Sequence, residues 1–172
     1  MLGYGEGLAL LRMGFGLYFL SNAISKITAG WLATGDPMMR AFIGPALQNN
    51  TAEGFYRPFL EGTVAPAAGT FAQLVVWGEL LVAVSLILGL FTRLGALGTM
   101  FLVLNYMLMK GLLNNAGSSD RLFFLAGLVF LLTSAGLVWG LDGYLRHIWA
   151  SNPFTRWSAG LTGRRPEQVP ST

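Results

Sequence analysis

The chain has 172 residues, of which 53% are hydrophobic and 11% are charged, with a formal net charge of +3. Soluble domains carry about 25% charged residues, so this composition excludes a soluble enzyme and a charge-rich disordered chain. Cysteine is absent and His147 is the only histidine, which excludes disulfides, an intrinsic iron–sulfur cluster, a bis-histidine haem and a histidine-rich metal site, and we expect no metal ligands.

Four apolar windows are long enough to cross a hydrocarbon core about 30 Å thick, which takes roughly 20 helical residues. They run from about residue 7 to 26, 71 to 91, 94 to 113 and 122 to 141. The sequence therefore predicts an all-α integral membrane protein, built as a bundle of four transmembrane helices. The turn at Thr92 is very short, which predicts an antiparallel hairpin of the second and third helices with Thr92 as N-cap.

The connection between the first two spans, about residues 31–70, is unusually long and contains four prolines. Asp36 followed by Pro37 is typical of a helix start. We expect two short amphipathic helices, near residues 37–48 and 52–61. This partly helical insert is predicted to lie outside the cytoplasm, on the membrane surface or over the end of the bundle.

Large apolar side chains in the insert need a covering surface, because exposed apolar clusters usually mark an interface or a membrane contact. A partner subunit is the favoured interpretation, and a simple lid over the helix ends is the alternative. The candidate interface residues are Met38, Met39, Phe42, Phe55 and Phe59.

Ionisable side chains inside a span cost about 2.5–3.5 kcal/mol on insertion scales and usually face partners within the bundle. Arg12 and Glu79 differ in predicted depth by roughly 10 Å, which a long arginine can largely cover. We therefore expect Arg12 or Asn105 to be the nearest polar partner of Glu79.

These residues belong to a predicted polar seam through the bundle, which consists of Arg12, Asn22, Lys26, Glu79, Asn105 and Tyr106. One hypothesis is that the seam binds a polar head group, such as that of a quinone, or forms part of a proton path. The alternative is that these side chains only join the helices through hydrogen bonds.

The excess positive charge lies mainly in a short segment near the C-terminus, from Arg156 to Arg165. Because basic residues next to a membrane favour the cytoplasmic side, both termini are predicted to be cytoplasmic. Residues 1–145 then form the membrane domain and residues 146–172 a basic tail. Membrane topology explains the charge better than nucleic-acid binding does.

Three stretches resemble the DoxX family of membrane proteins. The first helix of that family is similar to residues 10–26, LLRMGFGLYFLSNAISK, and the second to residues 75–93, VVWGELLVAVSLILGLFTR, which contain Glu79. Its closing glycine-rich stretch is similar to residues 134–145, SAGLVWGLDGYL. Together these cover most of residues 8–145. The long insert resembles the DoxD branch, the small membrane subunit of thiosulfate:quinone oxidoreductase.

This resemblance implies a multi-pass protein of a bacterial or archaeal cytoplasmic membrane, often part of a redox complex and linked to quinone. The favoured function is an accessory or quinone-site subunit of an electron-transfer complex. A structural subunit of a respiratory or photosynthetic assembly and a small transporter or proton-conducting protein are the alternatives. No catalytic set is visible, so enzyme activity of the chain alone stays open. The expected cofactor is non-covalent, a quinone or lipid, and the expected partners are membrane lipid and other subunits.

Overall fold

The computed structural model describes residues 3–112, 119–149 and 151–161, and within these ranges the regular elements are helical. In chain order they are α1 (Tyr4–Thr28), α2 (Gly35–Gln48), α3 (Arg57–Phe59), the π-helical turn η1 (Leu60–Val64), α4 (Ala68–Leu88), α5 (Thr92–Lys110), α6 (Asp120–Leu132), α7 (Leu141–Tyr144), α8 (Arg146–Trp149) and α9 (Pro153–Ser158). The predicted all-α fold class is therefore confirmed.

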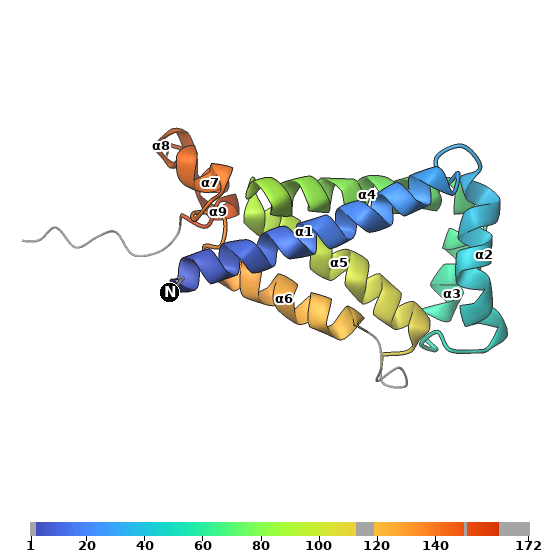
Figure 1. Cartoon of the computed structure of the whole chain (residues 1–172). Helices are drawn as coiled ribbons and strands as arrows, with labels where there is room; N and C mark the ends of the chain where they lie inside the picture. The colour runs from blue at the N-terminus through green and yellow to red at the C-terminus, as the bar shows by residue number, and fades with distance from the viewer. Residues whose placement is uncertain (1–2, 113–118, 150, 162–172) are drawn as a thin grey trace, which may run out of the picture.

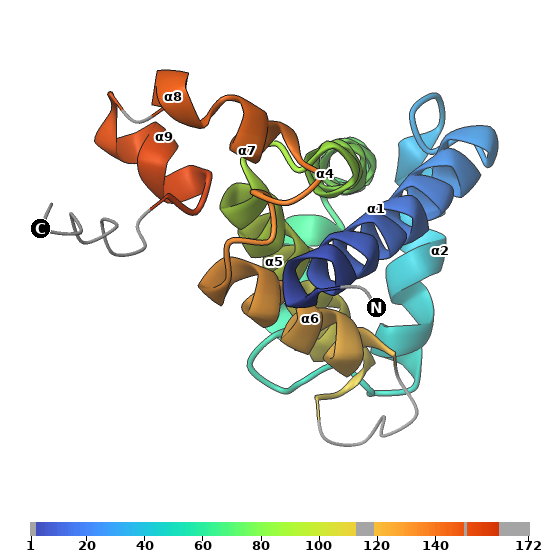
Figure 2. The same cartoon turned by 60° about the vertical axis from the view of Figure 1, so that its left-hand side comes forward.

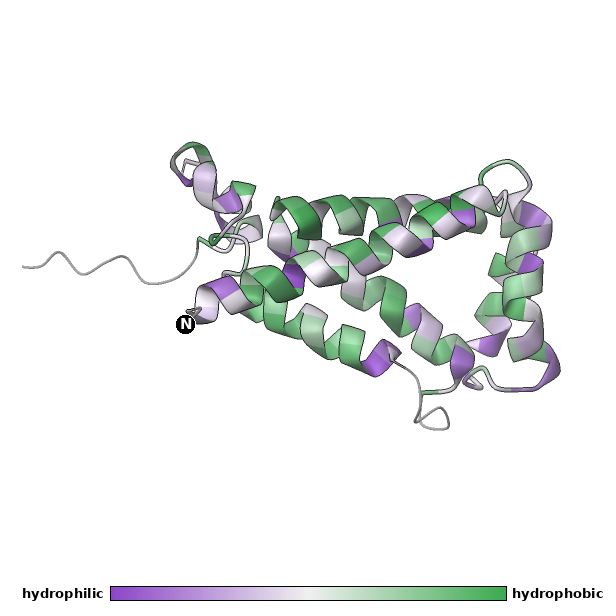
Figure 3. Ribbon diagram, viewed as in Figure 1, coloured by the Kyte–Doolittle hydropathy of each residue, from purple (hydrophilic) through white to green (hydrophobic). Residues whose placement is uncertain are grey.

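Four helices form the bundle, in which α1 packs along α4, α4 along α5, and α5 along α6 (Figure 1). Among the described residues, three helices are long and apolar enough to cross a membrane, namely α1, α4 and α5. The windows predicted for these spans agree with the helices within a few residues. Figure 3 shows the long helices as mostly hydrophobic ribbon, with hydrophilic residues at the start of α6, at the end of α5 and in α2.

The predicted fourth span is helical for a shorter stretch than expected. Helix α6 has 13 residues and ends at Leu132, so it extends about 20 Å, which is less than the hydrocarbon thickness. Thr133 takes an extended conformation, and the chain continues irregularly to α7. Four complete helical spans are therefore not seen in the described residues.

A contact between distant segments explains why the chain leaves the helix there. The two carboxylate oxygens of Asp142 accept the backbone N–H groups of Phe91 and Thr92, at 2.8 and 2.9 Å. Phe91, not Thr92, is the N-cap of α5. The predicted Thr92 cap is thus wrong, because Thr92 is the first residue of α5 and the N–H groups of Leu94 and Gly95 that its side chain would have bound donate to the Phe91 carbonyl.

The insert places α2 across the end of the bundle, opposite α7, α8 and α9, as Figures 1 and 2 both show. The first predicted insert helix is confirmed as α2, which begins at Gly35 with Thr34 as its N-cap. Asp36 is therefore not the cap; it pairs with Arg40 at 2.7 Å, one turn along α2. The second predicted helix, residues 52–61, is instead a turn that leads into α3 and η1.

Part of the predicted C-terminal tail folds onto the bundle. Arg93 Nη1 donates to the Trp157 carbonyl at 3.3 Å, and Ser134 Oγ donates to the Gly160 carbonyl at 2.8 Å. The group formed by α7, α8 and α9 lies at the same end of the bundle as the start of α1 (Figure 1). Residues 162–172 of the tail lie outside the described residues.

Candidate functional site

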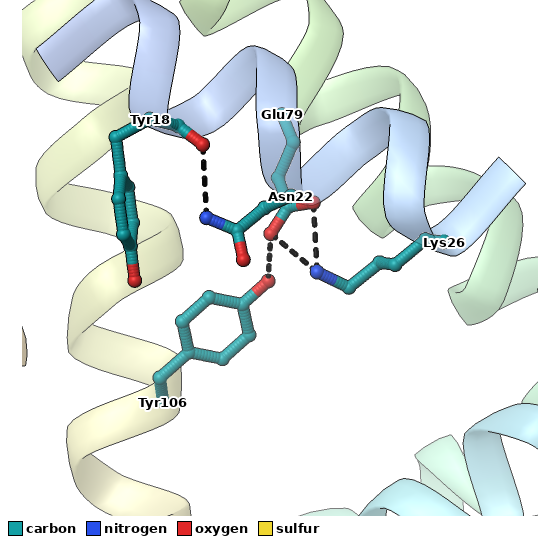
Figure 4. A network of polar contacts seen from close by, with 5 residues as sticks. All are labelled: Tyr18, Asn22, Lys26, Glu79 and Tyr106. Atoms are coloured by element: carbon teal, nitrogen blue, oxygen red, sulfur yellow. Dashed lines mark hydrogen bonds and ion pairs between the residues drawn. The ribbon is translucent and has the colours of Figure 1, made fainter. Parts of the chain in front are cut away.

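Glu79 lies inside the bundle, where its side chain is only 2% exposed. Lys26 Nζ donates to both of its carboxylate oxygens at 2.8 Å, and the Tyr106 hydroxyl donates to Glu79 Oε1 at 2.8 Å. Figure 4 shows these two side chains reaching the carboxylate from two different helices, α1 and α5. The prediction that Glu79 faces the bundle is confirmed.

A close helix contact determines which residues of α1 reach Glu79. A Cβ atom at Gly16 would lie 2.7 Å from the side chain of Ile87 and 2.8 Å from its backbone nitrogen, so the two helices touch there. The helices run in opposite directions. Glu79, about two turns before this contact on α4, therefore faces residues about two turns after Gly16 on α1, which are Asn22 to Lys26.

The predicted pairing of Arg12 with Glu79 is wrong. Arg12 lies one turn before Gly16, so the same register places it at the far end of α4, on the order of 15 Å from Asn22 along the helix axis. There its Nη2 donates to the Trp139 carbonyl at 3.0 Å.

Asn105 is not a partner of Glu79 either. Its side-chain oxygen accepts the Tyr56 hydroxyl at 2.6 Å, and its Nδ2 donates to the Phe101 carbonyl at 2.7 Å. Burial raises the pKa of Tyr56 above its ordinary value, so the hydroxyl stays protonated at neutral pH and available as a donor. The predicted continuous polar seam is therefore not formed: Arg12 and Asn105 each bind other partners, away from the Glu79 carboxylate.

A polar cavity of about 120 Å³ lies beside the Glu79 carboxylate. Its lining includes two ion pairs, Lys26–Glu79 and Lys110–Asp120, each with a nitrogen–oxygen distance of 2.8 Å. The side chains of the second pair are 40% and 11% exposed, against 15% and 2% for the first, so the second pair lies nearer the surface. Because the four charges cancel, the cavity suits a neutral polar group better than an ion.

Tyr106 lies between the two lysines of this cavity. Lys26 Nζ is 6.0 Å and Lys110 Nζ is 5.8 Å from the centroid of its ring, within range of cation–π attraction. The hydroxyl of Tyr106 and the ammonium group of Lys26 are hydrogen-bond donors directed into the same small space. The single hydroxyl hydrogen of Tyr106 is donated to Glu79, and Lys26 directs N–H groups to both oxygens of that carboxylate, so a carbonyl oxygen of a ligand could accept from the remaining N–H of Lys26.

A second, apolar pocket of about 190 Å³ adjoins the polar cavity. Phe42 and Tyr106 line both spaces, and their rings meet edge to face with centroids 5.9 Å apart. The pocket is enclosed by the insert on one side, through residues such as Ile43 and Leu60, and by α4 and α5 on the other. A polar space and an apolar space therefore share one aromatic wall.

The structure brings together four of the six residues predicted for the ligand site. Asn22, Lys26, Glu79 and Tyr106 line the polar cavity, where Asn22 Nδ2 donates to the Tyr18 carbonyl at 2.9 Å. Asn105 lines the apolar pocket, and Arg12 lines neither space.

The five insert residues predicted to meet a partner are divided in the structure. Met39 is 3% exposed in the core of the chain itself, and Met38 and Phe42 pack against that core. Phe55 is 74% exposed and Phe59 is 37% exposed. The surface left for a partner on this segment is therefore centred on Phe55.

Sequence reasoning missed Lys110, Asp120 and Tyr56 as members of the site. Lys110 and Asp120 lie on either side of the short connection between α5 and α6, so both are at the same end of the bundle. Opposite charges at the facing ends of two consecutive helices could have predicted the Lys110–Asp120 ion pair from the sequence. Nothing in the spacing of Tyr56 indicates its contact with Asn105.

A comparison with models of protein families finds a match. The model of the DoxX family matches residues 7–111, which is more than half of the chain and extends from α1 to the end of α5. Among curated proteins and among solved structures, none matches the chain significantly. The match covers Lys26, Glu79 and Tyr106 and ends before α6.

Proposed function

Because the chain belongs to the DoxX family, we propose that it is the quinone-site membrane subunit of an electron-transfer complex. The chain is a membrane protein with apolar helices, and its family is often linked to membrane redox functions. The observation that carries the proposal is the polar cavity beside Glu79, where donors from two helices meet next to an apolar pocket.

The chemistry of the cavity fits a quinone head. The cavity beside Glu79 measures about 120 Å³, less than the apolar cavity of about 150 Å³ that binds benzene in another protein, so a quinone ring would also occupy part of the adjoining apolar pocket of about 190 Å³. A quinone ring is neutral, and its carbonyl oxygens accept hydrogen bonds. Lys26 supplies the donor, while Glu79 fixes the positions of Lys26 and Tyr106 through its two oxygens.

Reduction of a quinone to a quinol takes up two electrons and two protons. We assign the proton side to this chain: the Lys26 ammonium is the proton donor at the inner part of the cavity, and Lys110 and Asp120 connect the cavity to the surface. The sequence has no cysteine and one histidine, so the electrons come from a redox group of a partner subunit.

The proposed topology follows the prediction from the basic tail. Helix α6 and the irregular stretch at 133–140 together make the fourth crossing, with both termini in the cytoplasm and the insert on the opposite side. With this topology, we assign the insert to the DoxD branch of the family. Phe55, exposed on the insert, is the proposed contact with a partner subunit.

A proton-conducting protein is the second candidate, since four charged side chains line one cavity. Conduction across the membrane would require the path to continue beyond Gly16 to the end near Arg12. There a Cβ atom on Gly89 would overlap Arg12 Nη1, and one on Gly140 would lie 2.6 Å from it. This close packing favours a site open at one end, as a quinone site requires.

Native purification tests the proposal. The full chain is extracted from its own membranes in a mild detergent, and co-purifying quinone and protein chains are identified by mass spectrometry. We expect near-stoichiometric quinone and at least one redox subunit, with quinone lost in Lys26→Met and retained in the control Tyr4→Phe, whose residue is 98% exposed. Quinone at the level of bulk lipid in all three proteins would contradict the proposal.

A further inference from the structure

The apolar pocket is large enough to hold part of a ligand, and its position relative to the polar cavity decides which part. Phe42 and Tyr106 line both spaces and form the wall between them, with their rings edge to face. A molecule whose polar head lies in the first space and whose apolar chain passes this wall would place that chain in the second.

The apolar pocket also has a rim that faces lipid. Leu74 on α4 and Phe101 on α5 line it, and they are 59% and 67% exposed. Both lie on candidate membrane-spanning helices, so their exposed faces meet acyl chains. An apolar chain can therefore enter from the bilayer between α4 and α5, or extend out through the same opening.

The insert forms the remaining wall of the pocket. Ile43 on α2 and Leu60 and Val64 on η1 are nearly buried, at 3%, 2% and 4% exposure, and all three line the pocket. The short Tyr56–Asn105 hydrogen bond links the insert to α5 beside them. Residues from the insert therefore determine the shape of the space that a chain would fill.

Resting on the proposed quinone site, we propose that the apolar pocket holds the isoprenoid tail of the quinone and that the insert selects for it. A phospholipid is a poorer occupant, because the two ion pairs leave the adjoining cavity without net positive charge for a phosphate group. Phe42, Leu60 and Leu74 are then specificity-determining residues for long-tailed quinones over tail-less ones.

Photolabelling of the detergent-purified full chain tests this proposal with two ubiquinone analogues. One carries an azide on the ring, and the other carries a diazirine on the first isoprenoid unit. Labelled residues are identified by peptide mass spectrometry. We expect the ring probe at Lys26 or Tyr106 and the tail probe on residues 59–75 or 101–109.

A variant at the lipid-facing opening of the apolar pocket tests whether the tail label depends on that pocket. Leu74→Trp narrows the opening and should reduce tail labelling at least fivefold while ring labelling stays within twofold. The control is Leu81→Trp, two turns along the same helix, which is 69% exposed and does not line the pocket. We expect it to change neither label.

The outcomes separate this inference from the function on which it rests. Ring labelling in the polar cavity with tail labelling on outward residues such as Trp77 or Leu81 would overturn the tail assignment and leave the quinone site standing. Ring labelling spread over lipid-facing residues would overturn both. Tail labelling that is unchanged in Leu74→Trp would also overturn the tail assignment.

Discussion

The two ends of the α1–α4 pair each bury a charged group of α1 against α4, but they differ in how closely that group is packed. At one end, Lys26 pairs with Glu79 beside a cavity of about 120 Å³. At the other, Arg12 is 0% exposed, and two glycines of neighbouring segments, Gly89 and Gly140, pack directly against its guanidinium. A buried charge inside a membrane bundle thus indicates a ligand site only where the packing leaves room for a ligand.

At the Arg12 end, hydrogen bonds hold residues 139–142 against α1 and the α4–α5 turn. Asp142 binds the turn through two backbone N–H groups, and Arg12 binds the same segment through the Trp139 carbonyl. Burial raises the pKa of Asp142, while the N–H donors and the positive charge of Arg12 act in the opposite direction. These hydrogen bonds join α1, the α4–α5 turn and residues 139–142.

The largest expected effect is at Gly89. This residue has φ of +62°, and a Cβ atom there would overlap the Arg12 guanidinium. Left-handed backbone costs an alanine about 1–2 kcal/mol, and overpacking typically adds about 1–3 kcal/mol. Gly89→Ala should therefore lower the thermal unfolding midpoint sharply or prevent recovery of folded protein in detergent.

Gly7→Ala is the matched control for Gly89, because nothing lies within 4 Å of a Cβ atom at Gly7 in the same bundle. We expect its unfolding midpoint to equal or slightly exceed that of the parent. Equal midpoints for the two alanine variants would show that the Arg12 end is not tightly packed, and the contrast between the two ends would fail.

Asp142→Ala should have the next largest effect. It removes the acceptor of two N–H groups at the start of α5 and leaves the buried charge of Arg12 without its nearby carboxylate, at a cost of about 2–4 kcal/mol. Asp142→Asn keeps one acceptor oxygen and should recover part of the loss in thermal unfolding. An asparagine variant no better than alanine would argue against the hydrogen bonds as the cause.

The helices of this bundle could be predicted from hydropathy, but the pairing of its charges could not. Hydropathy windows locate a residue along the membrane normal only to within a few positions. The register of α1 against α4 is fixed by the packing of Gly16 against Ile87. That contact brings Lys26, not Arg12, to Glu79. The tight α4–α5 hairpin was predictable because the turn is too short for any other arrangement.

The end of α6 and the enclosed insert were less predictable, because contacts between distant residues determine both. Residues 133–141 are apolar enough to extend helix α6. The helix nevertheless ends at Leu132, and the chain follows a path that brings Asp142 to the α4–α5 turn. In the insert, the presence of apolar side chains does not predict whether each one packs inside the chain or is exposed to a partner. The structure buries Met39 and exposes Phe55.

At the Glu79 end, changes should affect binding more than stability. Tyr106→Phe removes the hydroxyl that holds Glu79 in place beside the cavity, a hydrogen bond worth about 0.5–1.5 kcal/mol, which corresponds to roughly a twofold to tenfold loss of quinone affinity. The measurement is equilibrium binding of a short-chain ubiquinone to purified protein, with Tyr4→Phe as the control. A large fall in unfolding midpoint without loss of affinity would mean that Tyr106 supports the fold and not the ligand.

The smallest effect is expected for the exposed pair of Asp36 and Arg40 on α2, whose side chains are each 51% exposed. Exposed ion pairs separated by four helical residues contribute about 0.3–0.5 kcal/mol. Asp36→Ala should leave both the unfolding midpoint and quinone affinity within experimental error. A loss of quinone affinity in this variant would mean that α2 acts on the site through its exposed face.

The most direct test of the quinone site uses Trp31 as a reporter. Its ring centroid is 5.6 Å from Lys26 Nζ and 5.6 Å from the ring of Phe42, so it lies next to the polar cavity without lining it. In a variant that keeps Trp31 and replaces the other four tryptophans by phenylalanine, a short-chain ubiquinone should quench fluorescence saturably. The same titration should give at least tenfold weaker binding with Lys26→Met added. Quenching that rises linearly with quinone and is identical in both proteins would contradict a quinone site at Glu79.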